Sequence, residues 1–196
     1  MARTKGFEEA EVLDKAVNIF WCKGYNGTSM QDLIDGLGIS RSSLYDTFSD
    51  KKELFIAALK KYKGEQAAAM IAMIDNSASI LQTIQDLLKG LVAASVQDKE
   101  NRGCFMINST VETASHDADV AAIVAGNMND IEEALTKAIK KGQQSGEINP
   151  DYTARALARF LFNIISGMKV AGRAGADKKV YDDIVLVTMS VLKTNK

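Results

Sequence analysis

A single proline, Pro150, interrupts the 196 residues of this chain. Proline breaks a helix interior because it lacks the backbone donor and its ring clashes with the preceding turn, so its rarity permits long helices. Apolar residues recur at spacings of three and four, and no segment shows the strict alternation of a half-buried strand. The sequence therefore predicts an all-α protein.

Glycines and small polar residues divide this pattern into separate helices. Ser, Thr, Asn and Asp are the favoured N-caps because their side-chain oxygens accept from free amides of the first turn. The expected caps are Thr28 (in a capping box with Gln31), Ser40, Asp50 (with Glu53) and Asn149, the last followed by Pro150 at the first helical position. We expect about nine helices, near 7–23, 28–37, 40–47, 50–74, 77–97, 102–114, 118–144, 151–171 and 178–193.

Several classes of protein are disfavoured by composition. Two cysteines and one histidine cannot build a disulfide framework or a four-ligand zinc site. The histidine, His116, is expected in a helix-capping turn rather than at a metal. No apolar run approaches the roughly 20 residues that span a bilayer. We expect a soluble, cytoplasmic protein with no membrane, metal or cofactor.

Two short amphipathic segments joined at Gly38 have the pattern of a helix-turn-helix. In the second segment Ile39, Leu44 and Phe48 fall on the inner side. The outer side is left with Arg41, Ser42, Ser43, Tyr45 and Asp46. Such a face fits a DNA major groove, where arginine can bond guanine and serine can bond several base edges. From spacing alone, a merely solvated surface helix explains the pattern equally well.

Phosphate contacts are expected beside this face. Helix N-termini at Thr28/Ser29 and at Asp50/Lys51 present free amides to anions. Lys51 and Lys52 add positive charge there, and Arg3 and Lys5 add more from the N-terminal arm.

A longer stretch, "GYNGTSMQDLIDGLGISRSSLYDTFSDKKELF" at residues 24–55, resembles the DNA-binding domain of the TetR family of bacterial regulators. The matching positions are Gly24-Tyr25, Thr28-Ser29, Asp32-Leu33, Gly38-Ile39-Ser40, Leu44-Tyr45, Phe48, Lys51 and Leu54-Phe55. The resemblance implies a homodimeric, ligand-responsive repressor of double-stranded operator DNA. It also implies a helix-turn-helix domain at 1–50, continuing into the helix 50–74, and a ligand-binding and dimerisation domain at 51–196.

By position, the resemblance implies that Arg41, Ser42 and Ser43 read bases and that Tyr45 contacts the DNA backbone. The full set of expected DNA contacts is Thr28, Ser29, Ser40, Arg41, Ser42, Ser43, Tyr45 and Lys51. Two positions depart from the family's pattern. Gly36 stands where alanine is usual, and Asp46-Thr47 stands where an aromatic residue or histidine is frequent.

The second domain is expected to hold the effector. Methionine adapts to irregular ligands, so a Met- and Phe-rich cavity suits a small apolar or amphipathic molecule. The candidate lining residues are Met70, Met73, Phe105, Met106, Phe160 and Met168. Each of them fits simple core packing as well. The cavity itself is implied only by the resemblance.

Cys104 offers an alternative mode of regulation. Its surroundings resemble a branch of the TetR family in which a cysteine at the start of the sixth helix senses electrophiles or oxidants. A thiol at a helix N-terminus beside Arg102 can become reactive, whereas free cysteines are commonly inert and buried. Cys22 is expected to pack in its helix. Glu112 is expected to face solvent, with the cavity as the alternative.

Two remaining expectations concern catalysis and assembly. An enzyme or a purely protein-binding scaffold is disfavoured, because the sequence offers no nucleophile–base–orienter set and no phosphate loop. The last two helices carry long apolar stripes, which predict a four-helix dimer interface. The stripes consist of Leu157, Leu161, Ile164, Ile165, Met168, Ile184, Val187, Val191 and Leu192.

Overall fold

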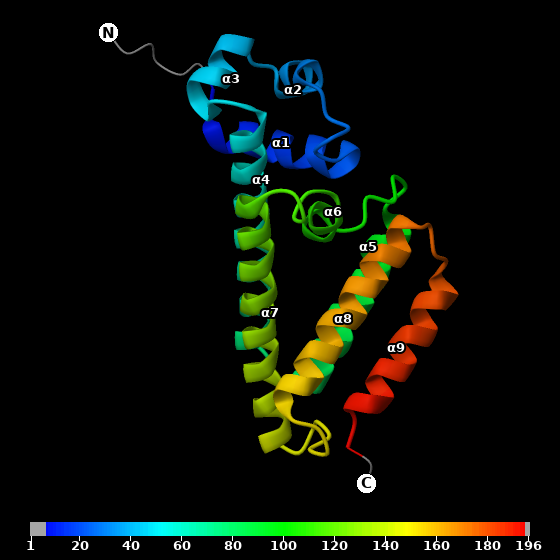
Figure 1. Cartoon of the computed structure of the whole chain (residues 1–196). Helices are drawn as coiled ribbons and strands as arrows, with labels where there is room; N and C mark the ends of the chain where they lie inside the picture. The colour runs from blue at the N-terminus through cyan, green and yellow to red at the C-terminus, as the bar shows by residue number, and fades with distance from the viewer. Residues whose placement is uncertain (1–6, 195–196) are drawn as a thin grey trace. The chain divides into compact units, whose positions relative to one another are not determined.

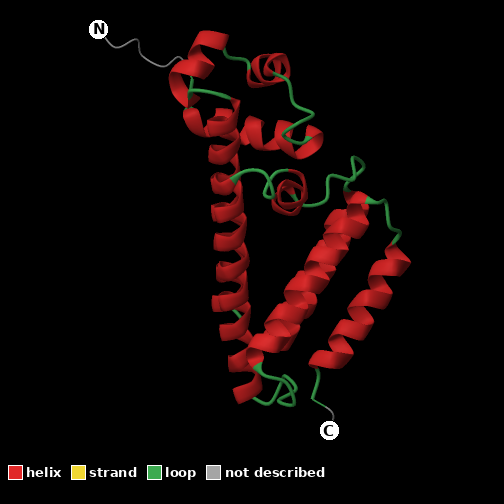
Figure 2. Cartoon of the chain, in the orientation of Figure 1, coloured by secondary structure: helices red, strands yellow, loops and turns green. Residues whose placement is uncertain are grey.

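The computed structural model describes residues 7–194, and these residues form nine α-helices (Figures 1 and 2). The all-α expectation is confirmed. The expected contacts of Arg3 and Lys5 lie outside the described residues. The helices are α1 Glu9–Lys23, α2 Met30–Leu37, α3 Arg41–Phe48, α4 Lys51–Asp75, α5 Ile80–Gln97, α6 Phe105–Glu112, α7 Ala118–Gln144, α8 Ala154–Arg173 and α9 Lys178–Leu192.

The cap of α2 lies one residue later than expected. Ser29, not Thr28, is the N-cap: its hydroxyl accepts from the Asp32 amide at 3.0 Å, and the Asp32 carboxylate accepts from the Ser29 amide at 2.8 Å. Thr28 is buried, and its hydroxyl donates to the carbonyl of Gly24 at 2.6 Å. The expected Thr28–Gln31 capping box is therefore wrong, because Thr28 is used to close the preceding turn.

The expected start of α8 at the proline is also wrong. The helix begins at Ala154, and the Thr153 hydroxyl accepts from the Ala156 amide at 3.2 Å. Asn149 is buried instead in a turn, where its side-chain oxygen accepts from the Asp151 amide at 2.8 Å. The backbone amide of Asn149 donates to the carbonyl of Leu192 at 2.8 Å, so this turn is fixed by the end of α9.

Two compact units make up the chain, and the first contains more than the helix-turn-helix. It includes the described residues up to Glu65 together with Cys104–Ala125. Aromatic rings form its centre: Phe55 lies 5.1 Å from Phe20 and 5.8 Å from Phe105 between ring centroids, both edge to face. Such pairs add to the stabilisation from buried apolar area. The segment around α6 thus shares one core with α1–α3.

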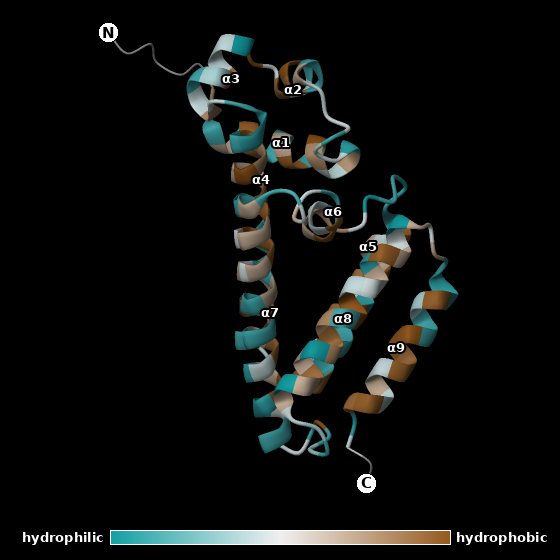
Figure 3. Cartoon of the chain, viewed as in Figure 1, coloured by the Kyte–Doolittle hydropathy of each residue, from teal (hydrophilic) through white to brown (hydrophobic). Residues whose placement is uncertain are grey.

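The second unit comprises Gln66–Gly103 and the described residues from Gly126 onward. Helices α5, α8 and α9 pack together within it, and each has apolar and polar faces (Figure 3). Ile84, Leu88, Leu161, Tyr181 and Leu192 belong to its core. Helices α4 and α7 contribute residues to both units, so a functional boundary at residue 50 stays a prediction.

None of the described helices is both long enough and apolar enough to cross a membrane.

Candidate nucleic-acid interface

Helices α2 and α3 form the expected helix-turn-helix. Gly38 ends α2 in the left-handed conformation, with φ 70° and ψ 27°, which glycine adopts without steric cost. Leu44 and Phe48 anchor α3, at 0% and 6% exposure. Because these residues hold one side of α3 in the core, the opposite side, with Arg41, Ser42 and Tyr45, is exposed to solvent.

Three serine hydroxyls gather at the N-terminus of α3. The Ser40 hydroxyl caps the helix by accepting from the Ser43 amide at 3.1 Å, as expected. It also lies 2.9 Å from the Ser42 hydroxyl and 3.0 Å from the Ser43 hydroxyl. The cluster satisfies its own hydrogen bonds. A base edge that bonds one of these hydroxyls must therefore replace an existing hydrogen bond. This requirement favours a base whose polar atoms match the geometry of the cluster.

The two lysines at the start of α4 have different surroundings. Asp50 caps α4 as expected, accepting from the Glu53 amide at 2.9 Å. Lys51 places its ammonium 4.4 Å from the centroid of the Tyr25 ring, and partial burial lowers the pKa of Lys51. Lys52 instead bonds the carboxylates of Asp117 and Asp119. Hence the structure leaves Lys51, rather than Lys52, suited to a phosphate.

The remaining two expected contacts lie at the start of α2. Ser29 is exposed, but its hydroxyl is engaged in the capping box described above. Thr28 is 1% exposed, so its side chain is not available at the surface. The structure therefore brings Ser40, Arg41, Ser42 and Tyr45 together on one exposed surface and leaves Thr28 out of it.

Glu112 is not a solvent-facing residue, contrary to expectation. Its carboxylate accepts from the Tyr25 amide at 3.0 Å and from the Asn26 amide at 2.7 Å. These two amides lie in the turn between α1 and α2. No sequence pattern pointed to this contact, because its partners are backbone groups 86 and 87 residues away.

The glycine that departs from the family's pattern faces α1. A Cβ at Gly36 would lie 2.6 Å from Cδ1 of Ile19, so an alanine there requires the end of the Ile19 side chain to move. Asp46 is exposed on α3, where a carboxylate disfavours a nearby phosphate.

Comparison with known proteins places this geometry in a family. Residues 12–58 match the profile for bacterial regulatory proteins of the tetR family, and residues 80–186 match a tetracyclin repressor-like C-terminal domain. The chain is 34% identical over 193 residues to the uncharacterized HTH-type transcriptional regulator YezE of Bacillus subtilis, covering 98% of this chain and 100% of that protein.

The chain belongs to the TetR family. It is also 32% identical to the HTH-type transcriptional repressor ComR of Escherichia coli, over 89% of this chain and 83% of that protein. The protein is therefore a DNA-binding transcriptional regulator, in agreement with the expectation that it is not an enzyme.

Solved structures share the fold. A cysteine mutant of the TetR-family regulator CifR, complexed with a 26-bp double-stranded operator DNA, superposes with a TM-score of 0.85. The two chains are 22% identical, and the match covers 97% of this chain and 100% of that chain. Reduced NemR of E. coli gives a TM-score of 0.86 at 13% identity, over 95% of this chain and 97% of that one.

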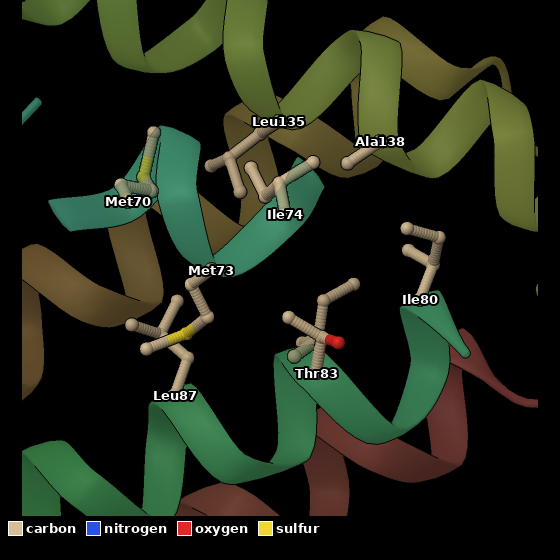
Figure 4. A pocket seen from close by; sticks show the side chains of 9 residues that line it. Met70, Met73, Ile74, Ile80, Thr83, Leu87, Leu135 and Ala138 are labelled. Carbon is tan, nitrogen blue, oxygen red and sulfur yellow. The ribbon is translucent and has the colours of Figure 1, made fainter. Parts of the chain in front are cut away.

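The TetR-family body does not bring the six expected effector residues together. Met70 and Met73 of α4 line a small apolar space with residues of α5 and α7 (Figure 4). Phe105 and Met106 are buried in the core of the first unit, and Met168 in that of the second. Phe160 is half-buried on α8 and does not line this space.

The space beside Met70 and Met73 is nearly filled. Its volume is about 10 Å³, enough for roughly one water molecule. In Figure 4 Met73 and Leu87 point toward one another, and Ile74 lies near Leu135. All of these side chains are apolar, so a ligand that entered here would have to push flexible methionines aside.

A wider groove, of about 650 Å³, lies between α5 and α9 in the second unit. None of its apolar residues was among the expected effector-binding or interface residues. It is lined by Val92, Val96, Val185, Leu186 and Met189, with Lys89, Lys178 and Lys193 among the polar residues.

The two cysteines also differ from expectation in part. Cys104 is the N-cap residue of α6 and is half-buried, with its sulfur 3.6 Å from the Tyr62 hydroxyl. Arg102 pairs with Asp98 at 3.2 Å, so that carboxylate offsets its charge. Cys22 is exposed rather than packed. The expected role of Cys104 in sensing stays a prediction.

The apolar stripes of α8 and α9 are divided between core and surface. Four of the nine expected interface residues, Leu157, Leu161, Met168 and Leu192, are at most 3% exposed and fill the unit's own core. The apolar residues that α8 and α9 expose include one of the nine, Val187, and three that were not among them. They are Val170, Val180, Leu186 and Val187, at 44–70% exposure.

Proposed function

We propose that this TetR-family protein is a repressor that binds an inverted-repeat operator and is released by a small apolar or amphipathic ligand. The observation that carries the proposal is the exposed face of α3, where Arg41, Ser42 and Tyr45 project beyond the Ser40 cap. Arg41 provides a forked donor for guanine, and Lys51 provides charge for a phosphate. A role on DNA agrees with the expected cytoplasmic location.

An inverted repeat requires a two-fold dimer. The exposed Val180 and Val187 share one face of α9 with the half-buried Ile184 and Val191. Exposed apolar surface of this kind is characteristic of interfaces, and a two-fold axis lets one patch meet its own copy. Symmetry then presents two copies of α3 to half-sites about 34–36 Å apart.

Operator reading is tested with Arg41→Ala. The wild-type protein selects a preferred sequence from a random duplex library, and affinity for that sequence and for random DNA is measured by fluorescence anisotropy. Loss of a bidentate base contact costs about 1–3 kcal/mol on the selected operator only. Arg155→Ala, an exposed arginine of α8, is the matched control. Equal losses on both DNAs would reject base reading by Arg41.

Release by a ligand rests on α4, the single helix that carries both Lys51 and the Met70–Met73 region. A ligand that enlarges the space beside Met73 favours a different position of this helix. Coupling of 1–3 kcal/mol lowers DNA affinity about 5–150-fold, and linkage requires the operator to weaken ligand binding equally. Calorimetry of a thermal-shift hit with and without operator tests this; equal affinities would exclude the switch.

A thiol switch is the second candidate, because Cys104 occupies the N-cap position of α6 beside the Tyr62 hydroxyl. Oxidation or alkylation of its sulfur would add a polar or bulky group at a half-buried site. An electrophile such as N-ethylmaleimide would then release operator DNA from the wild type but not from Cys104→Ser. Cys22→Ser is the control for the exposed thiol. Release that persists without Cys104 would exclude this mode.

A further inference from the structure

We propose that Glu112 is a positioning residue for operator binding. It acts without touching DNA, by holding the turn between α1 and α2 against the end of α6. The inference rests on the phosphate contact proposed above for Lys51. Glu112 is the last residue of α6, and its carboxylate accepts two hydrogen bonds from the turn that leads into α2.

Both oxygens of the Glu112 carboxylate accept a hydrogen bond from the turn. Oε2 accepts from the Tyr25 amide at 3.0 Å and Oε1 from the Asn26 amide at 2.7 Å. Hydrogen bonds to an ionised acceptor are about twice as strong as neutral ones. Two consecutive amides aimed at one carboxylate also restrict its orientation, so the contact determines where the turn lies.

Gly24 makes this approach possible. Its φ of +76° lies in the left-handed region, and a Cβ at this position would lie 2.8 Å from Oε2 of Glu112. The conformation disfavours a side chain at this position, and a side chain there would also displace the Glu112 carboxylate. The sequence Gly24-Tyr25-Asn26 therefore forms a cradle of backbone groups for one carboxylate.

The turn is connected directly to the residues expected to meet phosphates. The ring of Tyr25 lies beneath the Lys51 ammonium, at 4.4 Å from the centroid. On the other side of the turn, the Thr28 hydroxyl donates to the Gly24 carbonyl just before the cap of α2. A displacement of the turn therefore moves both the Tyr25 ring that contacts Lys51 and the N-terminus of α2.

The contact is also sensitive to the position of α6. Hydrogen bonds weaken steeply beyond about 3.2–3.5 Å, so a shift of α6 by about 1 Å breaks both. Residues Cys104–Ala125 belong to the same compact unit as α1–α3, so Glu112 lies within that unit. The position of α6 is thereby transmitted to the turn through the Glu112 carboxylate, in addition to the aromatic contacts of Phe105 in the shared core.

Charge and geometry have opposite effects here and must be separated. Burial lowers the pKa of Lys51, and the negative charge of Glu112 opposes this shift. Removing that charge alone favours DNA by reducing repulsion. Loss of the two hydrogen bonds to Glu112 weakens DNA binding, because the turn is no longer held in place. Glu112→Asp keeps the charge but is one methylene shorter, whereas Glu112→Gln keeps the length and loses the charge. Val111→Ala, at an adjacent residue that is 80% exposed, is the control.

The experiment is a double-mutant cycle with Lys51→Ala on the full-length protein. We expect Glu112→Asp to weaken binding to operator and to random DNA by the same factor, about tenfold, as for the loss of a charge-assisted contact. In the Lys51→Ala background the same change should cost less than about twofold. Hydrogen exchange should become faster at the Tyr25 and Asn26 amides and stay unchanged in α5 and α8.

Each other outcome overturns the proposal in a distinguishable way. Wild-type affinity of Glu112→Asp, with faster exchange at both amides, would show that the two hydrogen bonds to Glu112 do not position the DNA contacts. An undiminished loss in the Lys51→Ala background would show that Glu112 acts elsewhere. Normal DNA binding by Lys51→Ala alone would reject the proposed phosphate contact, and with it the proposal that Glu112 acts through Lys51. The effect of Arg41→Ala would still test base reading independently. If Glu112→Asp unfolds, Glu112→Gln in the same cycle provides the comparison.

Discussion

The ammonium of Lys52 lies 2.9 Å from a carboxylate oxygen of Asp117. A second carboxylate, that of Asp119, lies 2.8 Å from the same ammonium. The hydrogen bonds that Lys52 donates to Asp119 and Asp117 raise the pKa of Lys52. Its positive charge is therefore offset by two negative ones from the start of α7. Lys51, the preceding residue, rests on the Tyr25 ring and has no such pairing with these aspartates.

This difference predicts unequal effects of the two lysines on DNA binding. Lys51→Ala should weaken binding to every sequence and reduce the slope of log K against log salt by about 1 per protomer, because one released counterion is lost. Lys52→Ala should leave the slope nearly unchanged. Anisotropy titrations between about 50 and 200 mM salt measure both. A larger slope change for Lys52→Ala would mean that DNA displaces the aspartates.

Acid should weaken the first unit through its paired aspartates. The hydrogen bond from Lys52 lowers the pKa of Asp117. Hydrogen bonds from Lys23 and, to a smaller extent, from Ser29 lower the pKa of Asp32. A carboxyl with a lowered folded-state pKa stabilises the fold fully above its unfolded value, near 3.8, and the contribution is lost as pH falls through the folded pKa. Stability should therefore decline progressively below about pH 4.

Asp117→Asn tests the acid dependence directly. The variant should be less stable than wild type at pH 7, and the difference should shrink as pH falls below about 4. Urea unfolding followed by circular dichroism at several pH values measures it. Asp46→Asn, at an exposed carboxylate of α3, serves as the control. A difference between wild type and Asp117→Asn that did not depend on pH would contradict the assignment.

The second unit contains a buried hydroxyl that makes no hydrogen bond within the described residues, that of Tyr181. The residue is 0% exposed. An unsatisfied buried hydroxyl costs about 1–3 kcal/mol, so Tyr181→Phe should be neutral or stabilising. Thermal and urea unfolding measure it. Destabilisation by more than about 1 kcal/mol would indicate a partner, such as a bound water.

Gly172 provides a matched test of the same site. A Cβ there would lie 2.9 Å from the Tyr181 hydroxyl, so Gly172→Ala should destabilise by about 1–3 kcal/mol through overpacking. In the Tyr181→Phe background the clash is removed, and the cost should fall. An equal cost in both backgrounds would place the strain elsewhere, in a double-mutant cycle read by urea midpoints.

Val187 tests the proposed dimer interface. It is 60% exposed on α9, so a charge there is tolerated in an isolated chain but costly when buried between two copies. Val187→Glu should shift the protein from dimer to monomer at micromolar concentration in light scattering and should weaken operator binding. Val96→Glu, at a 52% exposed position of α5, is the control. Dimers that survive Val187→Glu would place the interface on another face.

Local physical chemistry in the sequence was enough to predict the helices and which face of α3 is exposed. The spacing of Leu44 and Phe48 decides which side of α3 is buried, so Arg41 and Ser42 must lie outside. Ser40 and Asp50 cap their helices as expected, because capping depends on atoms within three residues. The expected caps failed at Thr28, whose hydroxyl donates to the preceding Gly24 carbonyl, and at Asn149, which lies in a turn held by the Leu192 carbonyl through its backbone amide.

Tertiary structure alone decided which of these side chains remain available. Lys51 and Lys52 are adjacent in sequence, and they are distinguished by the approach of Asp117 and Asp119 to Lys52 and of the Tyr25 ring to Lys51. Glu112 has no local partner, and its role comes from two amides more than 80 residues away. Likewise Phe105 and Met168, alike in hydropathy, are buried in the cores of different units. A sequence pattern specifies faces of helices, whereas pairing of charges and amides depends on distances that arise only when the helices pack.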